Sequence, residues 1–261
     1  MSAEISRAPQ VARPSMPSSL PEKYLRDSAL VGLRMAFARH EYVALPGLFS
    51  TPQAFATLRA EVARLRQFAA GKNFVMPGYN TPRVMSTVGG RKIRRESPLL
   101  TAMYEEGSLS QLVSGIAGRS VFPCHDENEW MVVNWLEGQG ETHGWHLDDP
   151  AYALVIFAEA PAPGQGGEAE FITDWRRLRE RLGEDPDGEV GAAVENCREI
   201  GIVHSKAHAA GDAYLLRADR CLHRVAPLTT AGARRVVLNL AFEAKPDVYR
   251  KGITAAYLYE N

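Results

Sequence analysis

The chain has 261 residues, of which 45% are hydrophobic and 23% are charged. This is the composition of an ordinary globular protein, and it excludes a fibrous or disordered chain. The 30 basic and 31 acidic residues leave a formal net charge of −1, so no overall basic field exists to recruit nucleic acid or an anionic membrane. We therefore expect a small-molecule substrate, no nucleic-acid or membrane partner, and one large domain.

Residues 1–20 contain Pro and Ser but lack the apolar core of a signal peptide, and no apolar run approaches the roughly 18 residues of a membrane span. A flexible N-terminal tail and a cytoplasmic protein are predicted. Cys124, Cys197 and Cys221 are widely spaced and include no C-x-x-C pair. Neither a disulfide framework nor a thiolate zinc site is indicated, which agrees with a reducing compartment.

The first third of the chain is predicted to be largely helical. Apolar residues recur at helical spacing after a Ser-Pro-Glu start near residue 20, and a second amphipathic helix begins at a Ser/Thr cap near residue 51. A short strand and turn at 42–50 separate the two helices. Residues 70–98 carry Gly, Pro, Asn and many charges without a period, so we interpret them as a long loop, and as a lid over a small enclosed substrate. One or two short helices follow at 99–118.

From Val121 onward the chain consists of short β-rich runs separated by turns, interrupted by a helical or loop insertion at about 173–200. Strands of this length and spacing favour an antiparallel jelly roll. Helices first and strands after predict an α+β fold, with the N-terminal helices packed on one face of a jelly-roll core. The single domain would span 21–261, with three parts. These are a helical part at about 21–120, the core at about 121–243 and a C-terminal segment at 244–261.

A possible metal site lies where a polar loop meets an apolar run. A strand entered at Trp145 would direct His146 and Asp148 to one face and Asp149 to the other. His223, which follows a Gly-Asp turn and a short strand, supplies a third ligand. Two imidazoles and one carboxylate form the facial triad of non-haem Fe(II) oxygenases, which leaves positions open for a 2-oxo acid and O₂.

His204 and His208 are rival metal ligands by residue type. They precede the Gly-Asp turn, and no arginine stands at the right offset after them. We interpret both as surface or lid residues.

Arg234 and Arg235 stand at the start of a strand shortly after His223. A buried guanidinium there would bind the distal carboxylate of a 2-oxo acid in a bidentate pair. Strand alternation places Arg234 on a face of large apolar residues and Arg235, with Asn239, on a smaller and partly polar face. This favours Arg235, although a β-bulge would reverse the choice.

With these motifs the chain resembles the Fe(II)/2-oxoglutarate-dependent oxygenases, over roughly residues 120–243. The resemblance implies a double-stranded β-helix fold and three cofactors, Fe(II), 2-oxoglutarate and O₂. More narrowly, residues 129–172 resemble the group that acts on free amino acids, lysine above all, and that includes radical halogenases beside hydroxylases. In those halogenases a Gly replaces the triad carboxylate. Asp148 at that position implies a hydroxylase-type site.

The same resemblance implies a substrate shell. Arg83 would face the carboxylate of the amino acid with His143 beside it, Glu129 and Asn239 would hold amino groups, and Asp149 would lie near the side-chain ammonium. A zwitterion with an extra ammonium needs such a buried cation and paired carboxylates.

Two departures from that group bear on the side-chain pocket. Ala241 stands where relatives have a polar residue, and Tyr257 and Tyr259 stand where they have tryptophans.

The sequence thus predicts an Fe(II)/2-oxoglutarate dioxygenase that hydroxylates a C–H bond of a free basic amino acid, such as lysine or a lysine derivative. The two tyrosines keep open desaturation or oxidative ring formation on a modified lysine in a biosynthetic pathway. A cupin-like metal- or ligand-binding module is the non-enzyme alternative, and it has little need for an arginine directed into the barrel.

Overall fold

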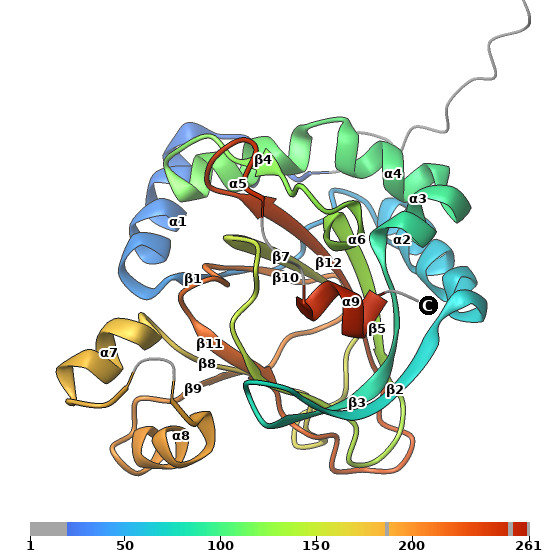
Figure 1. Cartoon of the computed structure of the whole chain (residues 1–261). Coiled ribbons are helices and arrows are strands. Elements are labelled where there is room, and N and C mark those ends of the chain that lie inside the picture. The colour runs from blue at the N-terminus through green and yellow to red at the C-terminus, as the bar shows by residue number, and fades with distance from the viewer. Residues whose placement is uncertain (1–19, 186–187, 250–252, 260–261) are drawn as a thin grey trace, which may run out of the picture.

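The computed structural model describes residues 20–185, 188–249 and 253–259 (Figure 1). The N-terminal tail expected at 1–20 lies outside this range except for Leu20, which is buried. In the described part of the chain, no helix is both long and apolar enough to cross a bilayer.

The two N-terminal helices form where the sequence predicts them. After the 3-10 turn η1 (Glu22–Tyr24), α1 spans Asp27–His40 and α2 spans Pro52–Leu65. The Oγ1 of Thr51 accepts a hydrogen bond from the Ala54 N–H at 3.1 Å, and the proline at the first helical position needs no partner for an N–H. The helices α4 (Pro98–Glu105) and α5 (Ser108–Ala117) follow, as expected.

The prediction of a long loop at residues 70–98 is wrong. This segment forms the antiparallel hairpin of β2 (Ala70–Met76) and β3 (Thr81–Val88), followed by the helix α3 (Gly90–Glu96). On β3 three of the four inward positions Thr81, Arg83, Met85 and Thr87 are polar, whereas Pro82 and Val84 face outward. A strand whose inner face lines a polar site lacks the apolar alternation by which strands are recognised. A lid built from a loop is therefore not present here.

A second local correction concerns the start of the strand after Val121. Residues Glu127–Trp130 form the short helix α6, and β5 begins only at Met131. The Asp126 side chain caps this turn by accepting the Asn128 N–H at 2.9 Å. The turn places Glu129 on a helix instead of a strand.

The strands form one curled antiparallel sheet, in the order β1-β10-β7-β12-β5-β3-β6-β11-β8-β9, with β2 beside β3 and β4 beside β12. The remaining strands are β1 (Tyr42–Leu45), β4 (Phe122–Pro123), β5 (Met131–Leu136), β6 (Thr142–His146), β7 (Tyr152–Glu159), β8 (Ala169–Ile172), β9 (His204–Lys206), β10 (Ala213–Leu216), β11 (Leu222–Val225) and β12 (Arg235–Glu243).

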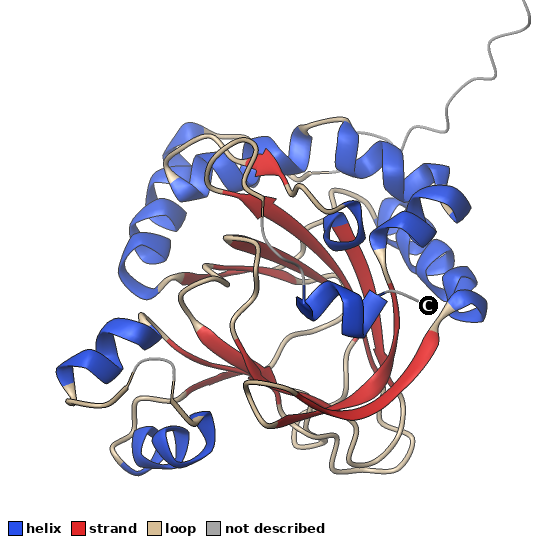
Figure 2. Cartoon of the chain, in the orientation of Figure 1, coloured by secondary structure: helices blue, strands red, loops and turns tan. Residues whose placement is uncertain are grey.

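The predicted α+β fold with a jelly-roll core is confirmed. Helices α1 to α5 lie along one side of the curled sheet, whereas α7 (Trp175–Arg181) and α8 (Val190–Glu199) of the predicted insertion lie apart from them (Figure 2). The C-terminal helix α9 (Ile253–Tyr259) packs against α6 and β3. Cys124, Cys197 and Cys221 are buried thiols.

Strand β12 divides the interior into a core and a cavity. Val236, Leu238, Leu240 and Phe242 belong to the main hydrophobic core under the N-terminal helices. Each such side chain contributes roughly 1.5–3 kcal/mol by its burial. The alternate residues Arg235, Val237 and Asn239 line an inner cavity. The two faces are those that the alternation predicts.

Candidate active site

Three potential metal ligands converge at one end of this cavity. His146 is the last residue of β6, and His223 lies directly opposite it on the neighbouring strand β11. The Oδ1 of Asp148 lies 3.2 Å from the Nε2 of His146 and 3.6 Å from the Nε2 of His223. All three ligand atoms lie within 4.8 Å of one another, and no other described group of His, Cys, Asp and Glu meets this criterion for a metal site.

Asp148 reaches the cluster by a different path from the one predicted. Strand β6 ends at His146, so the carboxylate comes from the following loop and not from the same strand face. The backbone N–H of Asp148 donates to the carbonyl oxygen of Ala218 at 3.0 Å. This bond ties the loop to the segment between β10 and β11, which also leads to His223.

Both imidazoles are oriented by the same backbone contact. The Nδ1 of His146 lies 2.8 Å from the carbonyl oxygen of Gly144, and the Nδ1 of His223 lies 2.9 Å from that of Cys221. A carbonyl oxygen accepts only, so each Nδ1 carries the proton and donates it. Each Nε2 lone pair is then directed toward Asp148, as metal ligation requires.

The charges at the cluster also suit a divalent cation. Burial and the neighbouring His223 lower the pKa of His146 to about 4, so its ring is neutral at pH 7. Burial raises the pKa of Asp148, but the adjacent His223 and His146 outweigh this effect and lower it well below its usual range. Neutral imidazoles and an ionised carboxylate are the protonation states that bind metal.

The two candidate arginines have opposite environments. Arg235 is 2% exposed, lines the same cavity as the triad, and has an Nε–H without a partner. It hydrogen bonds Tyr214, and its Cζ lies 4.9 Å from the centre of the Phe157 ring. Arg234 is half-exposed and lies outside the cavity, with nitrogens 2.8 Å from Glu137 and 2.9 Å from Glu159. Only Arg235 is placed to meet a ligand in the cavity.

Arg83 is fully buried on β3, opposite His143 of β6. Its Nη1 donates to the Oγ1 of Thr81 at 3.0 Å and to the carbonyl oxygen of Pro82 at 3.1 Å, whereas Nε and Nη2 have no hydrogen-bond partner among the described residues. Burial lowers the pKa of Arg83 to about 10, which leaves it charged at pH 7. A buried cation with unpaired donors calls for an anion.

Two of the other sequence-predicted substrate residues, His143 and Asn239, line the same cavity as the triad. His143 stacks on His146 with ring centres 4.1 Å apart, and its Nε2 has no partner. Asn239 lines the cavity with a partnerless Oδ1. Burial raises the pKa of Glu129 to about 8, with further contributions from Asp149 and Asp148. His143 and Asn239 thus line the triad cavity. Arg83, Glu129 and Asp149 are not among its lining residues, but Asp148 acts on the pKa values of Arg83 and Glu129, and Asp149 on that of Glu129.

Some residues of the cavity lie outside the predicted set. Tyr214 lines it from β10 and Tyr259 from α9. Tyr214 alternates with the core residues Ala213 and Leu215, so the polar inward residue of that strand is the signal that would have found it.

The two rival histidines differ from each other. His204 is exposed, as predicted. His208 is half-buried, with its Nε2 2.8 Å from the Oη of Tyr42 and its ring 4.8 Å from that of Phe157. It belongs to the aromatic cluster behind Arg235 and not to the open surface.

The family model for Halogenase D matches residues 25–259. No curated protein matches the chain. Among solved structures, the chain is similar to the non-haem α-ketoglutarate-dependent epimerase SnoN from nogalamycin biosynthesis, at 19% identity and a TM-score of 0.63 over 84% of each chain.

Two further structures share this fold. The carbocyclase SnoK from the same biosynthesis matches at 14% identity and a TM-score of 0.65, over 87% of this chain and 88% of its own. HygX from Streptomyces hygroscopicus, solved with nickel and 2-oxoglutarate, matches at 13% identity and a TM-score of 0.56, over 81% of this chain and 86% of its own. The chain belongs to the Halogenase D family, and with its His-Asp-His cluster in a jelly-roll cavity it is an Fe(II)/2-oxoglutarate-dependent oxygenase with Fe(II), 2-oxoglutarate and O₂ as cofactors.

Proposed function

We propose that this oxygenase hydroxylates a C–H bond of a free basic amino acid, such as lysine or a lysine derivative. The observation that carries the proposal is the pairing of opposite charges beside the triad. Arg83 is a buried cation with two unpartnered nitrogens, and Glu129 is a half-buried carboxyl with a raised pKa close to Asp149. A molecule with a carboxylate and a second, cationic end complements both.

His146, Asp148 and His223 would hold the iron, which supplies the activation of O₂ when it is bound. Arg235 would bind the distal carboxylate of 2-oxoglutarate, because it alone of the two arginines lies in the cavity, and Tyr214 would fix its guanidinium. Arg234 keeps its two carboxylate partners at the surface.

The substrate would be oriented by its charges. Arg83 would bind the carboxylate beside His143, and Glu129 and Asn239 would receive an amino group. Asp149 would lie near the side-chain ammonium. The approach of an ammonium favours the ionised form of Glu129, so binding of a cationic substrate would release a proton from it.

Hydroxylation is favoured over halogenation because Asp148 occupies the triad position that the radical halogenases leave to glycine. A carboxylate there fills the site that chloride would take. Desaturation or ring formation on a modified lysine is the second candidate. It is supported by Tyr259, which forms part of the cavity wall where the lysine-specific relatives have a tryptophan.

A cupin-like binding module has less support. Arg235 is a buried cation in the cavity, and its Nε has no hydrogen-bond partner in the part of the chain that the structure describes. Its burial costs folding free energy unless a ligand compensates it. A 2-oxo acid that chelates the metal and reaches Arg235 would do so.

The test begins with absorbance of the protein with Fe(II) and 2-oxoglutarate under anaerobic conditions. Air is then admitted together with each of a panel of free amino acids, and the consumption of 2-oxoglutarate is measured. We expect a charge-transfer band in the visible range, and consumption stimulated by lysine or a derivative. Mass spectrometry of the product separates a gain of one oxygen atom from a loss of two hydrogens. Stimulation by neutral or acidic amino acids but not by basic ones would exclude the proposed substrate class.

A further inference from the structure

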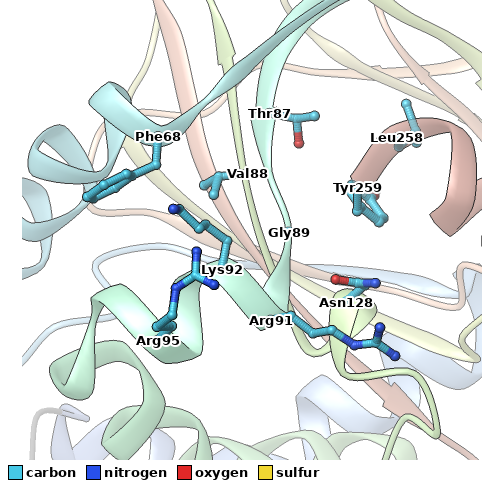
Figure 3. Close-up of a pocket in the computed structure, with 10 residues that line it drawn as sticks. All are labelled: Phe68, Thr87, Val88, Gly89, Arg91, Lys92, Arg95, Asn128, Leu258 and Tyr259. Atoms are coloured by element: carbon cyan, nitrogen blue, oxygen red, sulfur yellow. The ribbon is translucent and has the colours of Figure 1, made fainter. Parts of the chain in front are cut away.

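A second and larger cavity adjoins the one that faces the triad. It measures about 390 Å³, against about 50 Å³ for the metal-facing cavity. Figure 3 shows that it lies between helix α3 on one side and Asn128 and Tyr259 on the other, with Val88 and Gly89 between them. Tyr259 lines both cavities. We call this space, lined by Thr87, Arg91, Lys92, Arg95, Asn128 and Tyr259, the basic antechamber.

The wall between the two cavities is thin. Thr87 faces the antechamber and Asn134 faces the metal, and the Thr87 hydroxyl lies 2.7 Å from the Oδ1 of Asn134. The Tyr259 side chain completes the wall. It fits there because Gly89 has no side chain, since a Cβ at that position would lie 2.7 Å from the Cβ of Tyr259. The Thr87–Asn134 pair and Tyr259 thus form part of the wall between the two spaces.

The antechamber is positively charged. Arg91, Lys92 and Arg95 project from α3 at its edge (Figure 3). Their carboxylate partners are few and shared: Arg91 lies 3.4 Å from Asp126, and Lys92 and Arg95 lie 3.4 Å and 3.0 Å from the same Glu96. Exposed pairs of this kind contribute little to stability, so an entering anion can compete for the cations.

The metal-facing cavity is small for the two organic molecules that the reaction needs. A volume of about 50 Å³ holds a few water molecules, so 2-oxoglutarate, with ten non-hydrogen atoms, would leave no room there for a second organic molecule. On α6, Glu129 of the substrate region is next to Asn128 of the antechamber. A substrate longer than the metal-facing cavity would therefore extend into the antechamber, because Tyr259 lines both spaces.

We propose that the basic antechamber binds a carboxylate on an extended substrate, so that the substrate is a basic amino acid whose α-amine carries an acidic acyl group. The inference rests on the proposed function and narrows its substrate class. The amine at the other end stays with the carboxylates near the triad. The acyl chain passes Tyr259, which turns aside, and its carboxylate pairs with Arg91, Lys92 or Arg95.

The experiment compares three substrates on the iron-loaded full chain: lysine, Nα-succinyl-lysine and Nα-butyryl-lysine. The two acyl groups have the same chain length and differ in the terminal carboxylate. We expect kcat/KM, measured as 2-oxoglutarate consumption, to be at least about tenfold higher for the succinyl than for the butyryl compound, since charge-assisted contacts are the strong ones. Calorimetry on protein loaded with Ni(II) and 2-oxoglutarate, which does not turn over, should show the same preference in binding.

A triple variant assigns the preference to the antechamber. With Arg91→Gln, Lys92→Gln and Arg95→Gln combined, the ratio of succinyl to butyryl kcat/KM should fall to about one. The matched control removes the same charge from exposed positions elsewhere, Arg39→Gln, Arg59→Gln and Arg177→Gln, and should keep the ratio.

Each result separates this inference from the function on which it rests. Equal constants for the two acyl compounds, or a preference that survives in the triple variant, would overturn the antechamber assignment. Turnover of lysine with neither acyl compound accepted would overturn it as well and leave the proposed function standing. Consumption stimulated by none of the three would overturn both.

Discussion

Asp148 and Asp149 are neighbours in the chain with different surroundings. The carboxylate of Asp148 lies within 3.6 Å of both triad imidazoles. Asp149 lies outside the group of potential metal ligands. Burial raises the pKa values of Glu129 and Tyr259, and both Asp148 and Asp149 raise them further. The same substitution at each of the two positions therefore tests metal binding and substrate binding separately.

We predict that Asp148→Asn weakens Fe(II) binding by at least roughly 100-fold, because a charged ligand is lost. The absorbance band with 2-oxoglutarate should then disappear. Asp149→Asn should keep the band and raise the KM for lysine roughly tenfold. Titration of Fe(II) under anaerobic conditions and steady-state kinetics test the two variants. Equal loss of iron in both would show that the carboxylates are not divided in this way.

The arginines at the start of β12 form a second matched pair. Arg235→Gln should raise the KM for 2-oxoglutarate at least roughly tenfold, because the buried donor to its distal carboxylate is removed. Arg234→Gln removes the same charge from a half-exposed side chain with two surface carboxylate partners, so the KM should change less than about twofold. A larger effect from Arg234→Gln would reverse the assignment.

Glu129 is expected to make the stability of the metal-free protein depend on pH. Its folded pKa of about 8 lies above the usual 4.5, so the folded state binds this proton more tightly than the unfolded state. The contribution is complete below about pH 4.5 and is lost as the pH rises through about 8. The free energy of unfolding in urea should therefore fall between about pH 4.5 and about pH 8, and Glu129→Gln should reduce the slope. An unchanged slope in the variant would contradict the assignment.

At the scale of elements, helices α9 and α6 pack close to the start of α3 because two glycines stand there, and this packing brings α9 to the active site. A Cβ on Gly89 would lie 2.7 Å from the Tyr259 Cβ, and one on Gly90 would lie 1.9 Å from the carbonyl oxygen of Glu127. The start of α3 is thus shaped to receive α6 and α9. The wall between the two cavities depends on this packing.

Gly89→Ala should displace α9 and cost about 1–3 kcal/mol, since the clash is with a side-chain atom close to the backbone. The expected results are a lower Tm and faster proteolysis of the C-terminal segment. Gly71→Ala on β2 is the control, because no atom lies within 4 Å of the added Cβ. Similar Tm values for the two variants would mean that α9 is not in close contact with position 89.

At the scale of the whole molecule, the sheet order brings distant segments to one cavity. β6 and β11 are neighbours and carry the two triad histidines, while β3 is inserted between β5 and β6 and carries Arg83. A bound metal and 2-oxo acid therefore link several strands at once. Binding to the folded state alone stabilises it by mass action.

Ni(II) with 2-oxoglutarate, each at about 100 times its dissociation constant, should stabilise the protein by about 2.7 kcal/mol per ligand. For a chain of this size that is roughly 5–10 °C in Tm per ligand. Thermal denaturation before and after a chelator checks the shift. His223→Ala should lose the metal-dependent shift whatever its own Tm, and a shift of full size in that variant would place the metal elsewhere.

The sequence by itself determined the chemistry of the site and the class of fold. The separation of His146, Asp148, His223 and Arg235 along the chain is a pattern of residue types, and residue types define ligand chemistry. The alternation along β12 also identified its inward face correctly, because side chains on a strand alternate by geometry whatever the strand packs against. Helix starts such as Thr51 are equally local, since a cap bonds within its own turn.

Only the tertiary structure decided how these parts meet. The β2–β3 hairpin escaped prediction because three of the four inward residues of β3, Arg83 among them, are polar, and they are polar because other strands enclose a site against them. The path of Asp148 through a loop, the approach of Tyr259 to Gly89 and the basic antechamber all depend on contacts between segments far apart in the chain. The periodicity of apolar residues in the sequence describes one helix or strand at a time. A cavity is formed by several elements whose relative positions that periodicity does not define.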